Sequence, residues 1–149
     1  MIQKEPAMIN RFVFSLLFFF ILGGASAQST RPWTQDQLQD PEALANILRN
    51  KSAKQPLIFN IGPMENIKGA TSIGPTKDKS NLDKLRKALA TVPKDKTVII
   101  YCGCCPFRVC PNISPAFELL KEMKFTNPRL LNLEHNLKSN WIDQGYPMQ

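Results

Sequence analysis

Residues 97–102, TVIIYC, carry the strongest strand signal in the chain, because β-branched and aromatic side chains favour extended backbone. Residues 56–61, PLIFNI, form a second short run that is almost continuously apolar. A run of this kind indicates a strand that is covered on both faces, as the strands of parallel sheets are. These two segments favour architectures in which helices pack against both sides of a sheet.

Amphipathic helices are expected between the strands, because apolar residues recur there at helical spacing. The expected helices lie at residues 40–50, from Ser80, from Ser114 and within 137–147. Asp40 suits the N-cap of the first helix, and Pro41 suits its first turn. Shorter extended runs at 70–73 and 129–134 add two strands, and residues 29–39 are predicted to be an irregular lead-in.

The alternation of strands and helices predicts an α/β fold with a mainly parallel sheet and helices on both faces. The chain has 149 residues, which is enough for one domain with one core. No internal repeat or linker-like segment divides it. We therefore predict one domain over residues 28–149.

The first 27 residues predict a secretory signal peptide. Lys4 and Arg11 precede an apolar run at 12–22 that is short for a membrane span, and Ala25 and Ala27 form the small-residue cleavage pattern. Cleavage after Ala27 would export the protein to the periplasm or the extracellular space without a stable membrane span. An uncleaved membrane anchor is the alternative.

The formal net charge is +7, but the basic residues are scattered along the chain and form no run of five. This distribution favours a solvated basic surface over nucleic-acid binding. We expect a monomer that binds no nucleic acid.

All four cysteines lie within nine residues, at Cys102, Cys104, Cys105 and Cys110. A disulfide framework uses cysteines spread along the chain, since the cross-link acts by closing long loops. This cluster instead lies between the strongest strand and a predicted helix, at the sheet edge where ligands of α/β proteins bind. Backbone N–H groups and the helix dipole lower thiol pKa values at such a place. The cluster is therefore predicted to be chemical.

Several landmarks over roughly residues 33–147 resemble the rhodanese-like domain family of sulfurtransferases. These are the early strand at 56–61 with the turn at 67–70, the strand that ends at Cys102, and the closing segment RLLNLEHNLKSNWIDQGYP. The resemblance implies a sheet of about five parallel strands flanked by helices. Asn60 and Gly62 stand where the family usually has an acidic residue and an arginine, and His135 and Asn136 replace a pair of glycines.

The resemblance also implies a mechanism. The Cys102 thiolate would take the outer sulfur of a small donor as a persulfide and pass it to a thiol or protein acceptor. Loop N–H groups would cradle the persulfide, and Arg108 would hold anionic substrate or stiffen the loop. His135 is a candidate for the rim of the site. No cofactor or metal is implied, and the loop is longer than usual, with auxiliary thiols at Cys104, Cys105 and Cys110.

The same residues are also consistent with four other functions of the cysteine loop. Cys102 and Arg108 have the C-x5-R spacing of oxyanion-binding loops, although Pro106 removes one N–H donor. Cys102 and Cys105 form a C-x-x-C pair that suits thiol–disulfide cycling. Four thiols also suit zinc or, more easily in so short a loop, two- or three-coordinate Cu(I). The last alternative is a non-catalytic binding module.

Overall fold

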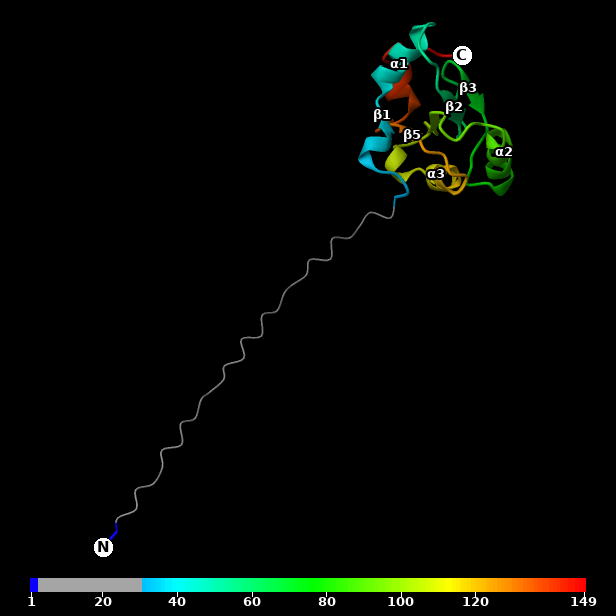
Figure 1. The fold of residues 1–149 in the computed structure, drawn as a ribbon. Helices are drawn as coiled ribbons and strands as arrows, with labels where there is room; N and C mark the ends of the chain where they lie inside the picture. Colours follow the sequence, from blue (N-terminus) through cyan, green and yellow to red (C-terminus); the bar gives the residue numbers. More distant parts are fainter. Residues whose placement is uncertain (3–30) are drawn as a thin grey trace.

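The computed structural model describes residues 1–2 and 31–149 of the chain (Figure 1). The predicted signal peptide, residues 1–27, lies outside the described residues apart from the first two. Within the described part of the chain, no helix is long and apolar enough to cross a membrane.

A five-stranded parallel sheet forms the centre of the described region, with the strand order β1-β5-β4-β2-β3. The strands are β1 (Leu38–Gln39), β2 (Leu57–Asn60), β3 (Ala70–Ser72), β4 (Val98–Tyr101) and β5 (Pro128–Leu131). The strand with the strongest sequence signal, β4, is central, and all four of its residues are buried. The predicted α/β class with a parallel sheet is confirmed.

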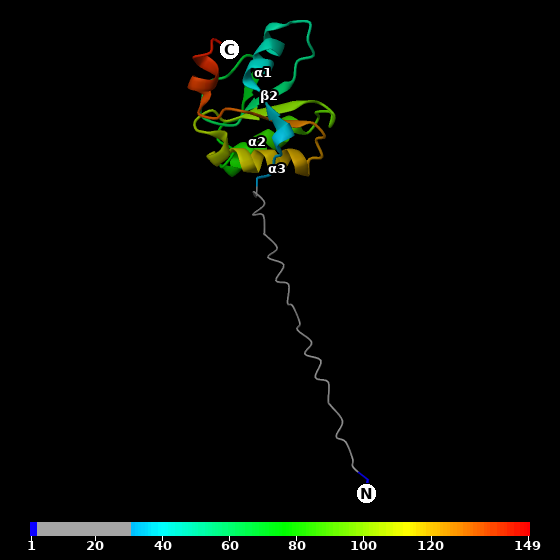
Figure 2. The same ribbon diagram turned by 90° about the vertical axis from the view of Figure 1, so that its left-hand side faces the viewer.

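Helices cover both faces of the sheet, as the apolar runs predicted. Figure 2 shows α2 (Lys79–Leu89) and α3 (Ile113–Glu122) on one side, and α1 (Pro41–Arg49) on the other side together with the C-terminal segment. Successive side chains of a strand point to opposite faces. Ile100 accordingly packs in the core with α2 and α3, while Ile99 packs in the core with α1.

The lead-in before α1 was predicted to be irregular, and this was wrong for its second half. Residues Gln35–Gln37 form a 3-10 turn, and Leu38 and Gln39 then pair with β5 as the edge strand β1. Two residues give no period-2 pattern to detect, so only the pairing partner defines this strand.

Two element boundaries also differ from the prediction. Helix α2 begins at Lys79 with Asp78 as its N-cap, so Ser80 lies inside the first turn. Strand β5 ends at Leu131 and not at residue 134, because a turn follows in which the Leu133 N–H donates to the Leu131 carbonyl oxygen. This turn directs the chain toward the cysteine loop.

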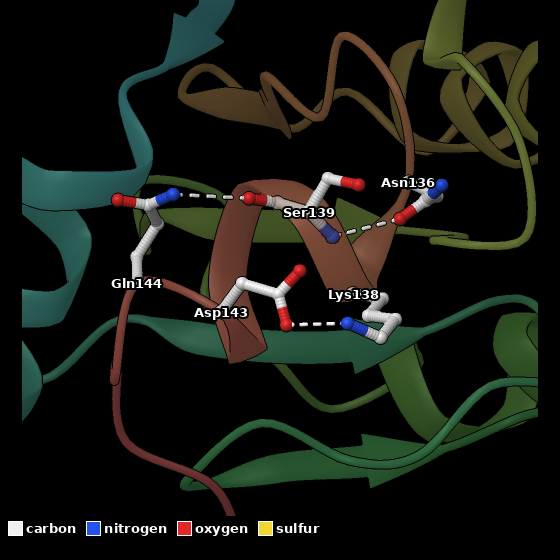
Figure 3. A network of polar contacts seen from close by, with 5 residues as sticks. All are labelled: Asn136, Lys138, Ser139, Asp143 and Gln144. Carbon is white, nitrogen blue, oxygen red and sulfur yellow. Dashed lines mark hydrogen bonds and ion pairs between the residues drawn. The ribbon is translucent and has the colours of Figure 1, made fainter.

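The predicted last helix is a single π-helical turn, Lys138–Ile142. The Asn136 side-chain oxygen accepts a hydrogen bond from the Ser139 N–H at 2.8 Å, and Lys138 pairs with Asp143 at 2.6 Å (Figure 3). Both members of this ion pair are well exposed, so it adds little stability. The turn is instead anchored by Trp141, which is fully buried against the α1 side of the sheet.

Candidate functional site

Cys102 follows directly on β4, at the carboxyl end of the central strand, as the sequence predicted. The Cys102 residue is only 1% exposed to solvent. The loop after β2 approaches it so closely that a Cβ atom on Gly62 would lie 2.5 Å from both the Sγ and the carbonyl oxygen of Cys102. Only glycine fits at this position. The sulfur is therefore held in a fixed place between the carboxyl ends of two neighbouring strands.

The four thiols form one cluster, and all are free. The Sγ atoms of Cys102 and Cys104 are 3.2 Å apart, and those of Cys104 and Cys105 are also 3.2 Å apart. Cys110 also belongs to the cluster, because its thiol lies near the Cys102 sulfur. The Sγ atoms of Cys102, Cys104 and Cys110 all lie within 4.8 Å of one another.

This arrangement differs from the C-x-x-C pairing that the spacing suggested. Cys102 contacts Cys104 and Cys110, whereas Cys105 contacts Cys104 and is not a member of the close group of three. The reason is the backbone of Gly103, whose φ of +78° places it in the left-handed region that favours glycine. The chain turns sharply there, and the side chain of Cys104 folds back onto Cys102.

Asn112, the N-cap residue of α3, makes a direct contact with the sulfur. Its Nδ2 lies 3.2 Å from the Cys102 Sγ, and the residue is 4% exposed. The other end of the amide is fixed, since Oδ1 accepts a hydrogen bond from the Lys77 N–H at 3.1 Å. The Asn112 carbonyl oxygen also accepts one from the Thr76 hydroxyl. The loop after β3 thus orients the amide so that its N–H group points at the sulfur.

The segment after β5 supports the cysteine loop from its other side. The Leu137 N–H donates to the Gly103 carbonyl oxygen at 2.8 Å, and the Phe107 N–H donates to the Leu133 carbonyl oxygen at 3.1 Å. A Cβ atom on Gly103 would meet the Leu137 Cβ at 2.8 Å, so glycine is required here for space as well as for conformation.

Asn60 organises the loop that carries Gly62. It is fully buried, and its Oδ1 accepts a hydrogen bond from the Gly62 N–H at 3.0 Å. Its Nδ2 donates to the Met64 carbonyl oxygen at 2.6 Å and to the Asn66 side chain at 3.1 Å. The sequence alone indicates no positioning role for Asn60 or Gly62, whereas the structure makes both of them positioning residues for Cys102.

The environment of Cys102 favours its thiolate. The neighbouring Cys110 thiol has the largest effect on Cys102 and helps to lower its pKa to about 5. Burial opposes this lowering, while the Cys104 backbone and the Asn112 side chain add to it. The proximity of Cys102 in turn raises the pKa of Cys110, and burial adds to this. Burial raises the pKa of Cys104 to about 12, and its contact with Cys102 adds to this. The cluster thus combines one thiolate with two neighbouring protonated thiols.

Two residues expected at the site are not joined to the sulfur. No hydrogen bond or ion pair links Arg108 to Cys102 within residues 31–149, and the exposed guanidinium lies 4.9 Å from the centroid of the Phe107 ring. His135 is exposed, and its backbone N–H donates to the Asn140 side chain at 2.7 Å. The oxyanion-binding interpretation of the C-x5-R spacing therefore has no contact between Arg108 and the Cys102 sulfur to support it in the described part of the chain.

Three residues of the site were missed in the sequence: Asn112, which contacts the sulfur, and Thr76 and Lys77, which hold Asn112 in place. Asn112 had a usable signal, since it is a polar residue directly before a predicted helix in the cysteine loop. Thr76 and Lys77 had none, because only the crossover after β3 brings them near. A pocket lined by Pro56, Lys96 and Ile99 lies at the opposite, amino end of the strands and contains no thiol.

Comparison with models of known families finds no match for this chain, and comparison with curated proteins finds none either. The chemistry of the site is therefore inferred from its own geometry.

Titration of the thiolate absorbance in the ultraviolet should show a midpoint near pH 5 in the reduced protein, because the Cys102 thiol ionises there and not at the ordinary value of 9.0. Cys102→Ser should remove this step, and Cys110→Ala should move it toward the ordinary value. A wild-type midpoint above pH 8 would contradict the stabilised thiolate.

Between pH 5 and 9, the Cys102 thiol is protonated more in the unfolded chain than in the folded protein. The contribution of this group to the free energy of unfolding therefore rises with pH across that interval.

Proposed function

We propose that the protein is an exported, rhodanese-like sulfurtransferase that carries sulfur as a persulfide on Cys102. The observation that supports this most directly is the position of Cys102 at the carboxyl end of β4, where the Asn112 amide donates to its sulfur at 3.2 Å. The lowering of the Cys102 pKa to about 5 agrees with this placement. A thiolate is the attacking form of cysteine, and it is available here across the whole neutral range.

The proposed reaction has two displacements. The Cys102 thiolate attacks the outer sulfur of a donor such as thiosulfate, forms a new S–S bond, and releases sulfite with the electron pair of the broken bond. An acceptor nucleophile then attacks the outer sulfur of the persulfide and restores the thiolate. The Asn112 Nδ2–H, which donates to the Cys102 sulfur, also stabilises the negative charge as it returns.

Access to the sulfur involves Cys104. Cys102 is almost fully buried, whereas Cys104 is exposed and its Sγ lies 3.2 Å from the Cys102 sulfur. A donor therefore reaches Cys102 by displacing the Cys104 side chain. This restricted access favours small donors. Arg108 is exposed, so it can attract anionic donors only from outside the loop.

The setting of this activity is also part of the proposal. The predicted signal at residues 1–27 would deliver the domain to the periplasm or the extracellular space, where a small sulfur donor and a thiol or protein acceptor are its expected partners. We expect the mature protein to act as a monomer and to bind no nucleic acid.

The proposal is tested by incubating the reduced protein with thiosulfate and cyanide and measuring thiocyanate. We expect product from the wild type and from Val109→Ser, a matched control in the same loop whose side chain is exposed. Cys102→Ala should form none. Thiocyanate formation that is equal in Cys102→Ala and the wild type, or absent from both, would overturn the sulfurtransferase.

A second candidate, thiol–disulfide exchange, is favoured by the 3.2 Å between the Cys102 and Cys104 sulfurs. The Cys102 thiolate would attack a disulfide of a partner and release one partner thiol. The Cys104 thiol would then attack the Cys102 sulfur, form the Cys102–Cys104 disulfide and release the second thiol. This mechanism predicts an intact mass two hydrogens lower after treatment with oxidised glutathione. The double variant Cys104→Ser/Cys110→Ser, which lacks both thiols near the Cys102 sulfur, should instead retain glutathione on Cys102.

A further inference from the structure

We infer that Cys102, Cys104 and Cys110 form a binding site for Cu(I), held by three thiolate sulfurs. The three Sγ atoms lie within 4.8 Å of one another, and no other His, Cys, Asp or Glu of residues 31–149 joins them in a group of that size. This inference does not depend on sulfur transfer, because it needs three sulfurs where the persulfide needs one.

The distances between the three Sγ atoms suit the binding of one metal ion by all three sulfurs. Sulfur ligands that each lie ~2.3 Å from one metal ion are about 3.8–4.0 Å apart, depending on whether the geometry is tetrahedral or trigonal. The Cys102 and Cys104 sulfurs are 3.2 Å apart and must move slightly farther apart to bind one ion. The distances from the Cys110 sulfur to these two sulfurs are already below 4.8 Å. Cys104 is exposed, so its side chain is the one that is free to move.

The number and type of ligands select the ion. Thiolate sulfur is a soft ligand that favours Cu(I) and zinc over magnesium, calcium or manganese. Zinc in structural sites takes four ligands, whereas the close group here has three members. The sole histidine, His135, is exposed and is not a member of it. A three-coordinate site is therefore matched by Cu(I), which does not require a fourth ligand.

The surroundings support a bound ion in two ways. Cys102 and Cys110 are 1% and 5% exposed, which fixes two ligands and keeps water away, while exposed Cys104 leaves a route of entry. Asn112 donates from Nδ2 to the Cys102 sulfur at 3.2 Å, and its own Oδ1 is held by the Lys77 N–H. Such a hydrogen bond to a ligand sulfur orients it and offsets its negative charge.

The test is a competition between the reduced protein and a chromogenic Cu(I) chelator under exclusion of oxygen, with Cu(I) supplied as its acetonitrile complex. We expect one ion per chain and three sulfur neighbours by X-ray absorption. Cys104→Ser and Cys110→Ser should each weaken Cu(I) binding by at least about tenfold. Loss of a residue that only supports a metal ligand already costs about this much, and loss of a ligand itself should cost no less. Cys105→Ser and Val109→Ser should bind as the wild type does.

Each other result would overturn the inference. Failure of the wild type to compete with the chelator would exclude the site. Four sulfur neighbours, equal loss of binding in Cys105→Ser, or a preference for zinc over Cu(I) would replace the three-thiolate site by a four-thiolate one.

Circular dichroism of each metal-free variant shows whether the variant is folded. Asn112→Ala, which keeps all three ligands, gives a second test, because it should weaken Cu(I) binding. Thiocyanate formation without Cu(I) binding would remove this inference alone, and the reverse would remove the sulfurtransferase alone.

Discussion

We expect the Gly62→Ala variant to lose sulfur transfer and to be less stable than the wild-type protein. The added Cβ would lie 2.5 Å from both the carbonyl oxygen and the Sγ of Cys102, closer than atoms can approach. Since Gly62 and Cys102 are both buried, the conflict is relieved only by moving the loop or the sulfur. Overpacking of this kind costs about 1–3 kcal/mol in free energy of unfolding.

Denaturant unfolding and thiocyanate formation measure the two effects, and Gly69→Ala is the matched control. Gly69 has a φ of +77°, so alanine is strained there, but its Cβ would meet nothing within 4 Å. The control should cost about 1–2 kcal/mol from backbone strain and keep its thiolate titration near pH 5. A Gly62→Ala protein with normal thiolate titration and sulfur transfer would show that this close contact does not position Cys102.

The sheet could be predicted from the sequence because its inner strands carry dense apolar signals. β2 and β4 lie at the centre of the parallel sheet, so their side chains are buried on both faces and the sequence shows it. β1 could not be found in the same way. It has two residues, and its extended form depends on the backbone of β5, from which it is far in sequence.

The location of the reactive thiol was also predictable, but its partners were not. Cys102 follows the strongest strand, and strand-to-helix loops of α/β sheets are where sites form. Sequence spacing pointed to Cys105 as its partner, whereas the left-handed turn at Gly103 brings Cys104 to 3.2 Å instead. A glycine in a loop does not reveal the sign of its φ angle, so this pairing needed the fold.

Asn60 has a physical role that only the structure reveals. In the resemblance to rhodanese-like domains its position usually holds an acidic residue, which only accepts hydrogen bonds when ionised. Here the side chain both accepts, from the Gly62 N–H at 3.0 Å, and donates, to the Met64 carbonyl oxygen at 2.6 Å. The hydrogen bonds of the Asn60 side-chain amide therefore hold the loop after β2 in place. The close approach of Gly62 to Cys102 depends on these hydrogen bonds.

Asn60→Ala and Asn60→Asp should both be strongly destabilised, by about 3 kcal/mol or more in free energy of unfolding, since each buried polar group left unpaired costs about 1–3 kcal/mol. Aspartate has the shape of asparagine, but it places an oxygen against the Met64 and Glu65 carbonyl oxygens where Nδ2 now donates. Asn81→Ala is the matched control, because within residues 31–149 its amide donates only to the Pro75 carbonyl oxygen, and it should cost about 1 kcal/mol. Denaturant unfolding gives all three values. If Asn60→Asp were as stable as the wild type, the donor end of the amide would not hold the loop, and the departure from the acidic residue would have no structural consequence at this site.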